Sequence, residues 1–148
     1  MMIDRGVESA RQVLRVAFGV VPFLAGLDKF FNLLTDWQGY LSPAAAAILP
    51  VTPETFMHAV GVIEMAVGVA ILTRWTLIGS LVAAAWLVAI ALNLVASGRY
   101  LDVAVRDLVM ATGAYALARL TQAAEATRAA ATVPIEARND RARVGRVA

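Results

Sequence analysis

The sequence predicts an all-α protein, an antiparallel four-helix transmembrane bundle with a short interfacial helix in its first outward loop. Hydrophobic residues make up 60% of the 148 residues and charged residues only 16%, whereas soluble domains are roughly 45–50% apolar and about 25% charged. The chain also offers four stretches close to the ~20 apolar residues that cross the hydrocarbon core of a bilayer.

The first expected span covers residues 14–34 and follows a basic N-terminal segment, residues 1–13. A basic start before an apolar run is also typical of a signal peptide. Here, however, Asp28, Lys29 and two phenylalanines stand where a signal peptide has small residues for cleavage. We therefore expect a retained helix.

The first loop, residues 35–55, contains two helix-start signals. Ser42-Pro43 and Thr52-Pro53 each place a capping side chain directly before a proline, a combination that favours the start of a helix. The first signal predicts a short helix in the membrane interface, and the second opens the next span.

The remaining spans are expected at residues 54–73, 75–96 and 102–120. Gly98 follows the third span, where glycine commonly ends a helix. The transmembrane domain thus covers residues 14–120. Residues 121–148 form an arginine-rich tail that we expect to be cytoplasmic and partly disordered.

Basic residues flank these spans unequally. With both termini in the cytoplasm, most arginines lie on the inner side, and the outer side carries only Lys29, Arg99 and Arg106. Such an excess of basic residues is typical of the cytoplasmic loops of membrane proteins. We therefore expect a multi-pass protein with both termini cytoplasmic.

Polar residues within the spans fall in the outer half of the membrane when depth is counted at 1.5 Å per residue. They are candidates for a ligand-binding site or for a buried ion-pair network: Asp28, Lys29, His58, Glu64, Asn93, Arg106 and Asp107. A lone charge at the bilayer centre costs about 3 kcal/mol on insertion scales. We therefore expect Glu64 to pair with Lys29 or with Arg106.

Glycines share helix faces with two of these charges. Gly61, Glu64 and Gly68 recur at intervals of three and four, as do Gly26 and Lys29. Small residues let membrane helices approach closely. Each glycine face therefore brings a charged residue into a helix–helix contact.

Several short motifs occur in order along the chain: RVAFG at residues 15–19, FLAGLDKF at 23–30, GVIEMAVG at 61–68 and Arg106-Asp107-Leu108. In order and spacing they resemble the DoxX family of small four-helix bacterial membrane proteins, over residues 12–120. The resemblance implies a bacterial cytoplasmic (inner) membrane protein. It also implies a link to membrane redox complexes, because the family takes its name from a subunit associated with thiosulfate:quinone oxidoreduction.

Three functions remain open. The first is an accessory subunit of a membrane redox system, which binds a quinone or a lipid headgroup in the outer-half polar pocket. The second is a structural or assembly protein in which Glu64 is a packing latch. The third is a small-solute or proton carrier that uses Glu64. An accessory subunit fits better than a self-contained enzyme, and we assign no catalytic residue.

The composition excludes several other classes of site. The absence of cysteine excludes a dithiol relay and covalent haem attachment. A single histidine, His58, with one glutamate makes a poor metal site, so quinone is the one cofactor that we consider. The expected partners are the lipid bilayer and other membrane subunits or a second copy. Nucleic acid is not expected, because the arginine-rich tail lacks interleaved aromatic residues.

Overall fold

The computed structural model describes residues 5–132, and every regular element in this range is helical, which confirms the all-α class. Four of these helices are long, and two short ones lie in the first loop. In chain order they are α1 (Arg5–Asp28), η1 (Trp37–Tyr40), α2 (Pro43–Ile48), α3 (Pro53–Leu72), α4 (Thr76–Ser97) and α5 (Leu101–Thr132).

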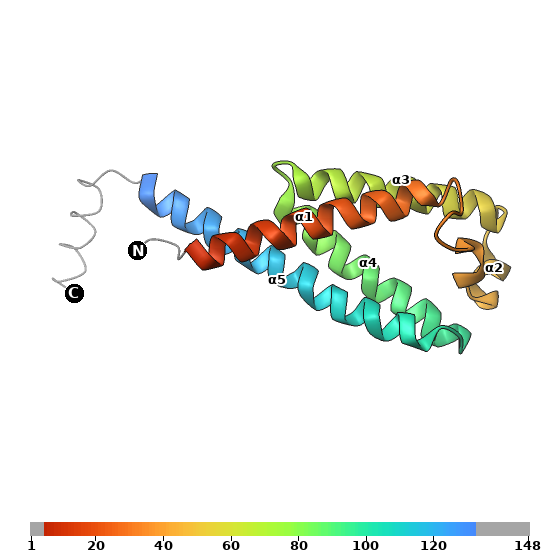
Figure 1. The fold of residues 1–148 in the computed structure, drawn as a ribbon. Coiled ribbons are helices and arrows are strands. Elements are labelled where there is room, and N and C mark those ends of the chain that lie inside the picture. Colours follow the sequence, from red (N-terminus) through yellow and green to blue (C-terminus); the bar gives the residue numbers. More distant parts are fainter. Residues whose placement is uncertain (1–4, 133–148) are drawn as a thin grey trace.

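The long helices lie in two pairs, with α1 beside α3 and α4 beside α5 (Figure 1). The pairs meet at the end where α1 begins and α5 finishes, which we call the terminal end, and they diverge toward the opposite, α2 end. Phe18, Ile71, Ala83 and Leu117 come from all four long helices and pack into one buried cluster. A second cluster joins α4, α5 and the first loop.

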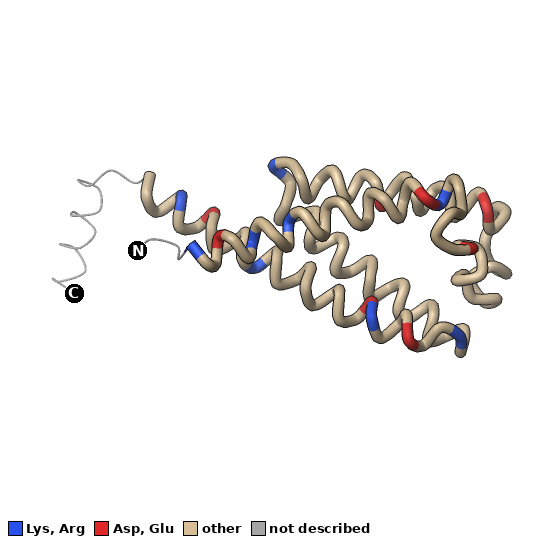
Figure 2. The backbone as a smooth tube through the Cα atoms, in the orientation of Figure 1, with Lys and Arg blue, Asp and Glu red and all other residues tan. Residues whose placement is uncertain are grey.

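Three helices, α1, α3 and α4, are long and apolar enough to cross a membrane. The fourth predicted span corresponds to α5, which is not among them: Asp102, Arg106 and Asp107 lie in its first two turns, and Arg119, Gln122 and Glu125 follow in its second half. Charges gather toward the two ends of the molecule, and long uncharged stretches of α3 and α4 lie between them (Figure 2). Many large apolar side chains on these helices are exposed, as is usual where lipid rather than water covers a helix.

Three of the predicted boundary signals act as expected. Ser42 and Thr52 accept hydrogen bonds from the backbone N–H groups of Ala45 and Thr55, at 3.1 and 3.2 Å, and so cap α2 and α3. Gly98 ends α4 in the left-handed conformation, with φ of 66°, which glycine adopts without a steric penalty.

The bounds of α1 differ from those of the first predicted span. The helix already begins at Arg5, and it ends at Asp28, whereas the prediction continued to residue 34. The carboxylate of Asp28 accepts hydrogen bonds from the backbone N–H groups of Leu33 and Leu34, both at 3.1 Å. The prediction is wrong here because the apolar run continues past the point where these bonds turn the backbone.

The predicted terminal segments are only partly described. Residues 5–13 belong to α1, and residues 121–132 continue α5. The disorder that we expect in the tail concerns residues 133–148, which lie outside the described range.

Glycines allow the backbones of α1 and α3 to touch. A Cβ atom added to Gly61 would lie 2.5 Å from the carbonyl oxygen of Gly26 and 3.2 Å from the Cβ of Lys29. One added to Gly68 would lie 2.5 Å from the carbonyl oxygen of Gly19. The glycine faces predicted from the sequence therefore form the contact between these two helices.

We expect Gly61→Leu to force α1 and α3 apart and to destabilise the protein by at least the ~1–3 kcal/mol typical of overpacking, because backbone atoms of Gly26 block the new side chain. Ala66→Leu is the matched control, since Ala66 lies on the exposed face of the same helix. Thermal unfolding in detergent measures both. Equal midpoints for the two variants would contradict the close contact.

Candidate functional site

A buried ion pair joins α1 to α3. Lys29, the first residue after α1, places its Nζ 2.6 Å from Oε2 of Glu64, which lies in the middle of α3. The two side chains are only 4% and 10% exposed. Of the two partners that the sequence suggests for Glu64, the structure brings Lys29 to it.

Two tryptophans complete the surroundings of this pair. The Nζ atom of Lys29 lies 3.7 Å from the centroid of the Trp37 ring, a cation–π contact. On the other side, Nε1 of Trp86 donates a hydrogen bond to Oε1 of Glu64 over 3.4 Å. Both charges are therefore engaged, and α4 is tied to the pair through Trp86.

Asp28 has a different role from its neighbour Lys29. Besides the backbone N–H groups that it binds after α1, its carboxylate accepts a hydrogen bond from Nε1 of Trp37 at 2.8 Å. The indole of Trp37 thus binds Asp28 through its N–H and faces Lys29 with its ring. The adjacent charges serve two purposes, since Asp28 fixes the loop and Lys29 fixes α3.

Asn93 and His58 make separate contacts at the same end. Asn93, on α4, donates through Nδ2 to the carbonyl oxygen of Tyr40 at 2.8 Å and accepts from the backbone N–H of Ser42 at 3.2 Å. It thereby anchors the first loop to α4. The ring of His58 stacks on Phe30, with centroids 4.8 Å apart.

Arg106 and Asp107 stay further from the pair. Asp107 is half-buried and interacts electrostatically with Arg106 and with Glu64. Arg106 is exposed, and in the described part of the chain no hydrogen bond or ion pair joins it to Glu64. The alternative pairing of Glu64 with Arg106 is therefore not the one formed.

Sequence reasoning missed the part that the tryptophans take. Neither Trp37 nor Trp86 is among the predicted site residues, because an indole donor carries no signal of its partner in the sequence. Within residues 5–132, no group of three or more His, Cys, Asp or Glu side chains is placed to hold a metal ion. The site therefore consists of an ion pair, one indole N–H donor from Trp86 and the ring face of Trp37.

Comparison with known proteins places this arrangement in a family. The family model of DoxX matches residues 10–97. The chain belongs to the DoxX family. No curated protein and no solved structure matches it.

The match to the DoxX model covers α1 to α4 and includes Lys29, Glu64 and both tryptophans. It ends before α5, so the Arg106-Asp107-Leu108 motif lies outside the matched range. Membership of the DoxX family, together with the three apolar helices, identifies a membrane protein.

We expect Glu64→Ala to destabilise the protein by about 3–5 kcal/mol, because it leaves the charge of Lys29 buried without a partner. The double variant Lys29→Met/Glu64→Leu should lose less, since it removes both charges and keeps apolar volume. Unfolding in detergent measures both, with the exposed Glu54→Ala as the control. An unchanged midpoint for Glu64→Ala would show that the pair contributes nothing.

Proposed function

We propose that the chain crosses the bacterial cytoplasmic membrane four times as an antiparallel bundle, with both termini in the cytoplasm and α2 in the outer interface. As the fourth span, α5 has 32 residues, roughly 48 Å at 1.5 Å per residue, which exceeds the ~30 Å hydrocarbon core. Its charged first turns lie at the α2 end, where Arg106 can reach lipid headgroups. Arg15 and Arg74 lie at the terminal end, which favours the cytoplasm for that end.

Single cysteines test this topology, because the natural chain contains none. In intact cells we expect a membrane-impermeant maleimide to label Arg99→Cys, between α4 and α5. Arg74→Cys, between α3 and α4, and Thr132→Cys, at the end of α5, should react only after permeabilisation. Labelling of Arg99→Cys and Thr132→Cys from the same side would show that α5 does not span.

For this membrane domain we propose a non-catalytic, accessory role in a larger membrane assembly. The buried pair of Lys29 and Glu64 carries the proposal, since both charges are engaged and hold α1 and α3 in one register. The carboxylate of Glu64 already binds Lys29 and Trp86 within the protein. This favours a latch over an exchangeable proton site, and therefore an assembly role over a proton carrier.

A second candidate is the binding of a quinone or lipid headgroup beside Glu64. The hydrogen bond from Trp86 to Glu64 is long, at 3.4 Å, compared with the 2.6 Å that separates the carboxylate from Lys29. The link between α4 and Glu64 is therefore weaker than the link between α1 and Glu64. A headgroup with a carbonyl oxygen is suited to accept the Trp86 hydrogen bond in place of Glu64.

One pair of measurements separates these candidates. If the assembly role is correct, the tagged chain migrates in mild-detergent extracts of its native membranes with specific subunits, well above its own 15.7 kDa. A soluble quinone analogue should then leave its tryptophan fluorescence unchanged. A chain that migrates alone, with fluorescence quenched by the analogue in the natural protein but not in Trp86→Phe, would replace the assembly role by the second candidate.

A further inference from the structure

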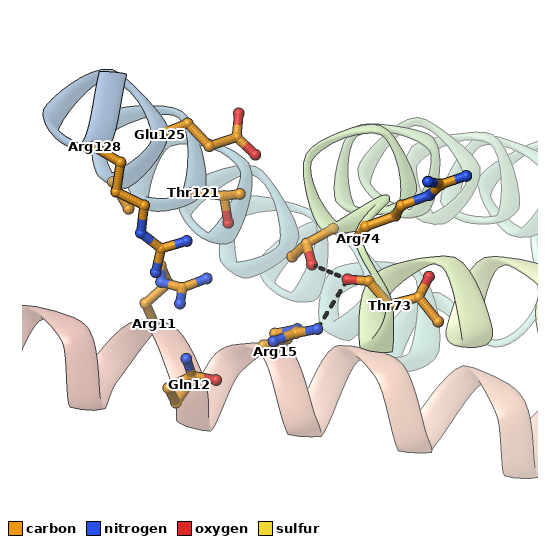
Figure 3. Close-up of a pocket in the computed structure, with 10 residues that line it drawn as sticks. Arg11, Gln12, Arg15, Thr73, Arg74, Thr121, Glu125 and Arg128 are labelled. Carbon is orange, nitrogen blue, oxygen red and sulfur yellow. Dashed lines mark hydrogen bonds between the residues drawn. The ribbon is translucent and has the colours of Figure 1, made fainter. Parts of the chain in front are cut away.

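A cavity of about 360 Å³ lies at the terminal end of the molecule, and Figure 3 shows its lining residues. Its walls come from the N-terminal half of α1, the turn between α3 and α4, and the C-terminal part of α5. Four of its lining residues are arginines: Arg11, Arg15, Arg74 and Arg128. Neither proposed function uses this cavity.

The cavity carries an excess of positive charge. Among its described lining residues, Glu125 is the one acidic side chain. Glu8 lies outside the lining and binds Arg11 at 2.6 Å. If each of these acids neutralises one arginine, two positive charges remain. Positive side chains with no acid to match them attract an anion.

Two of the arginines are held in place by the fold. Arg15 donates through Nε to the carbonyl oxygen of Ile71 at 3.0 Å and through a terminal nitrogen to that of Thr73 at 2.8 Å, so that it caps the end of α3. Arg11 is held by Glu8. For Arg128, by contrast, the described residues provide no hydrogen bond and no ion pair, only an electrostatic interaction with Glu8.

Thr121 supplies the observation that points to a ligand. Its residue is 4% exposed and lines the cavity, and its hydroxyl has no hydrogen-bond partner among the described residues. Thr112, Thr127 and Thr132 of the same helix each donate to a carbonyl oxygen one turn earlier. A buried hydroxyl without a hydrogen-bond partner lowers the stability of the folded protein. We therefore expect the Thr121 hydroxyl to donate to an acceptor from outside the chain.

We propose that this cavity binds a phosphate group, with Thr121 and Arg128 as its donors and Arg11 and Arg15 as the positive surroundings. The N–H groups of an arginine guanidinium match the geometry of phosphate oxygens, and hydrogen bonds between charged groups are stronger than those between neutral groups. The volume greatly exceeds the ~30 Å³ share of one water molecule. The cavity also lies at the ends of apolar, membrane-crossing helices, the level at which a bilayer presents phosphates.

The phosphate can come from an anionic phospholipid or from a free phosphate ester, and two measurements on the purified full chain distinguish these sources. The first is native mass spectrometry from nanodiscs of phosphatidylcholine with phosphatidylglycerol, which counts retained phosphatidylglycerol. The second is the thermal shift in detergent with inorganic phosphate, because a ligand that binds only the folded state raises its stability. Binding in either measurement supports the site, and the measurement that detects it identifies the source.

Variants tie the binding to this cavity. We expect Arg128→Gln and Thr121→Val each to weaken binding roughly tenfold, which corresponds to one charge-assisted hydrogen bond. Glu125→Gln should strengthen binding, and Arg119→Gln, which removes an exposed charge of α5 outside the lining, should leave it unchanged. Without ligand, Thr121→Val should be at least as stable as the natural protein, because it removes an unsatisfied hydroxyl.

The proposal is overturned if neither measurement detects binding. It is equally overturned if Arg128→Gln and Thr121→Val bind as well as Arg119→Gln does. A loss of stability in ligand-free Thr121→Val would show that the hydroxyl has a partner within the protein and would also contradict the site.

Discussion

The energetic penalty of a charge in an apolar environment governs this structure. Glu64 lies in the middle of α3, where an unpaired carboxylate costs about 3 kcal/mol on insertion scales, and the Nζ of Lys29 at 2.6 Å offsets that penalty. The pair forms only if the end of α1 lies beside the middle of α3. Gly26 and Gly61 permit this close approach, so the ion pair and the glycine contact fix the same register.

The first loop extends this constraint to α4. Trp37 binds Asp28 through its N–H and covers Lys29 with its ring, and Tyr40 of the same short helix is bound by Asn93. Because Trp86 also reaches Glu64, α4 contacts the α1–α3 unit through two routes. The loop is therefore an integral part of the ion-pair site and more than a connection between helices.

Local patterns predicted much of this fold. Ser42, Thr52 and Gly98 act through residues close in sequence, so their signals can be read from the sequence. Helical spacing and membrane depth predicted a basic partner for Glu64 but left Lys29 and Arg106 as alternatives, and the structure forms the pair with Lys29. The end of α1 could not be predicted, because it depends on the hydrogen bonds that the Asp28 carboxylate accepts from Leu33 and Leu34 in the folded loop. The exposure of Arg106 depends on how α5 is rotated and on the divergence of the helix pairs, which no spacing encodes.

The two ends of the molecule differ in how many of their buried polar groups have partners within the protein. This difference suggests a structural role for one end and a binding role for the other. At the α2 end the buried charges are paired and have indole neighbours, so rearrangement there would break the α1–α3 contact. At the terminal end arginines outnumber acids around a cavity, and a buried hydroxyl lacks a partner. Glu64 lies roughly 12 Å along the helix before the end of α3 at Leu72, and the cavity begins beyond that end. Because the lining of the cavity includes neither Lys29 nor Glu64, the proposed ligand would not contact the pair that holds α1 and α3 together.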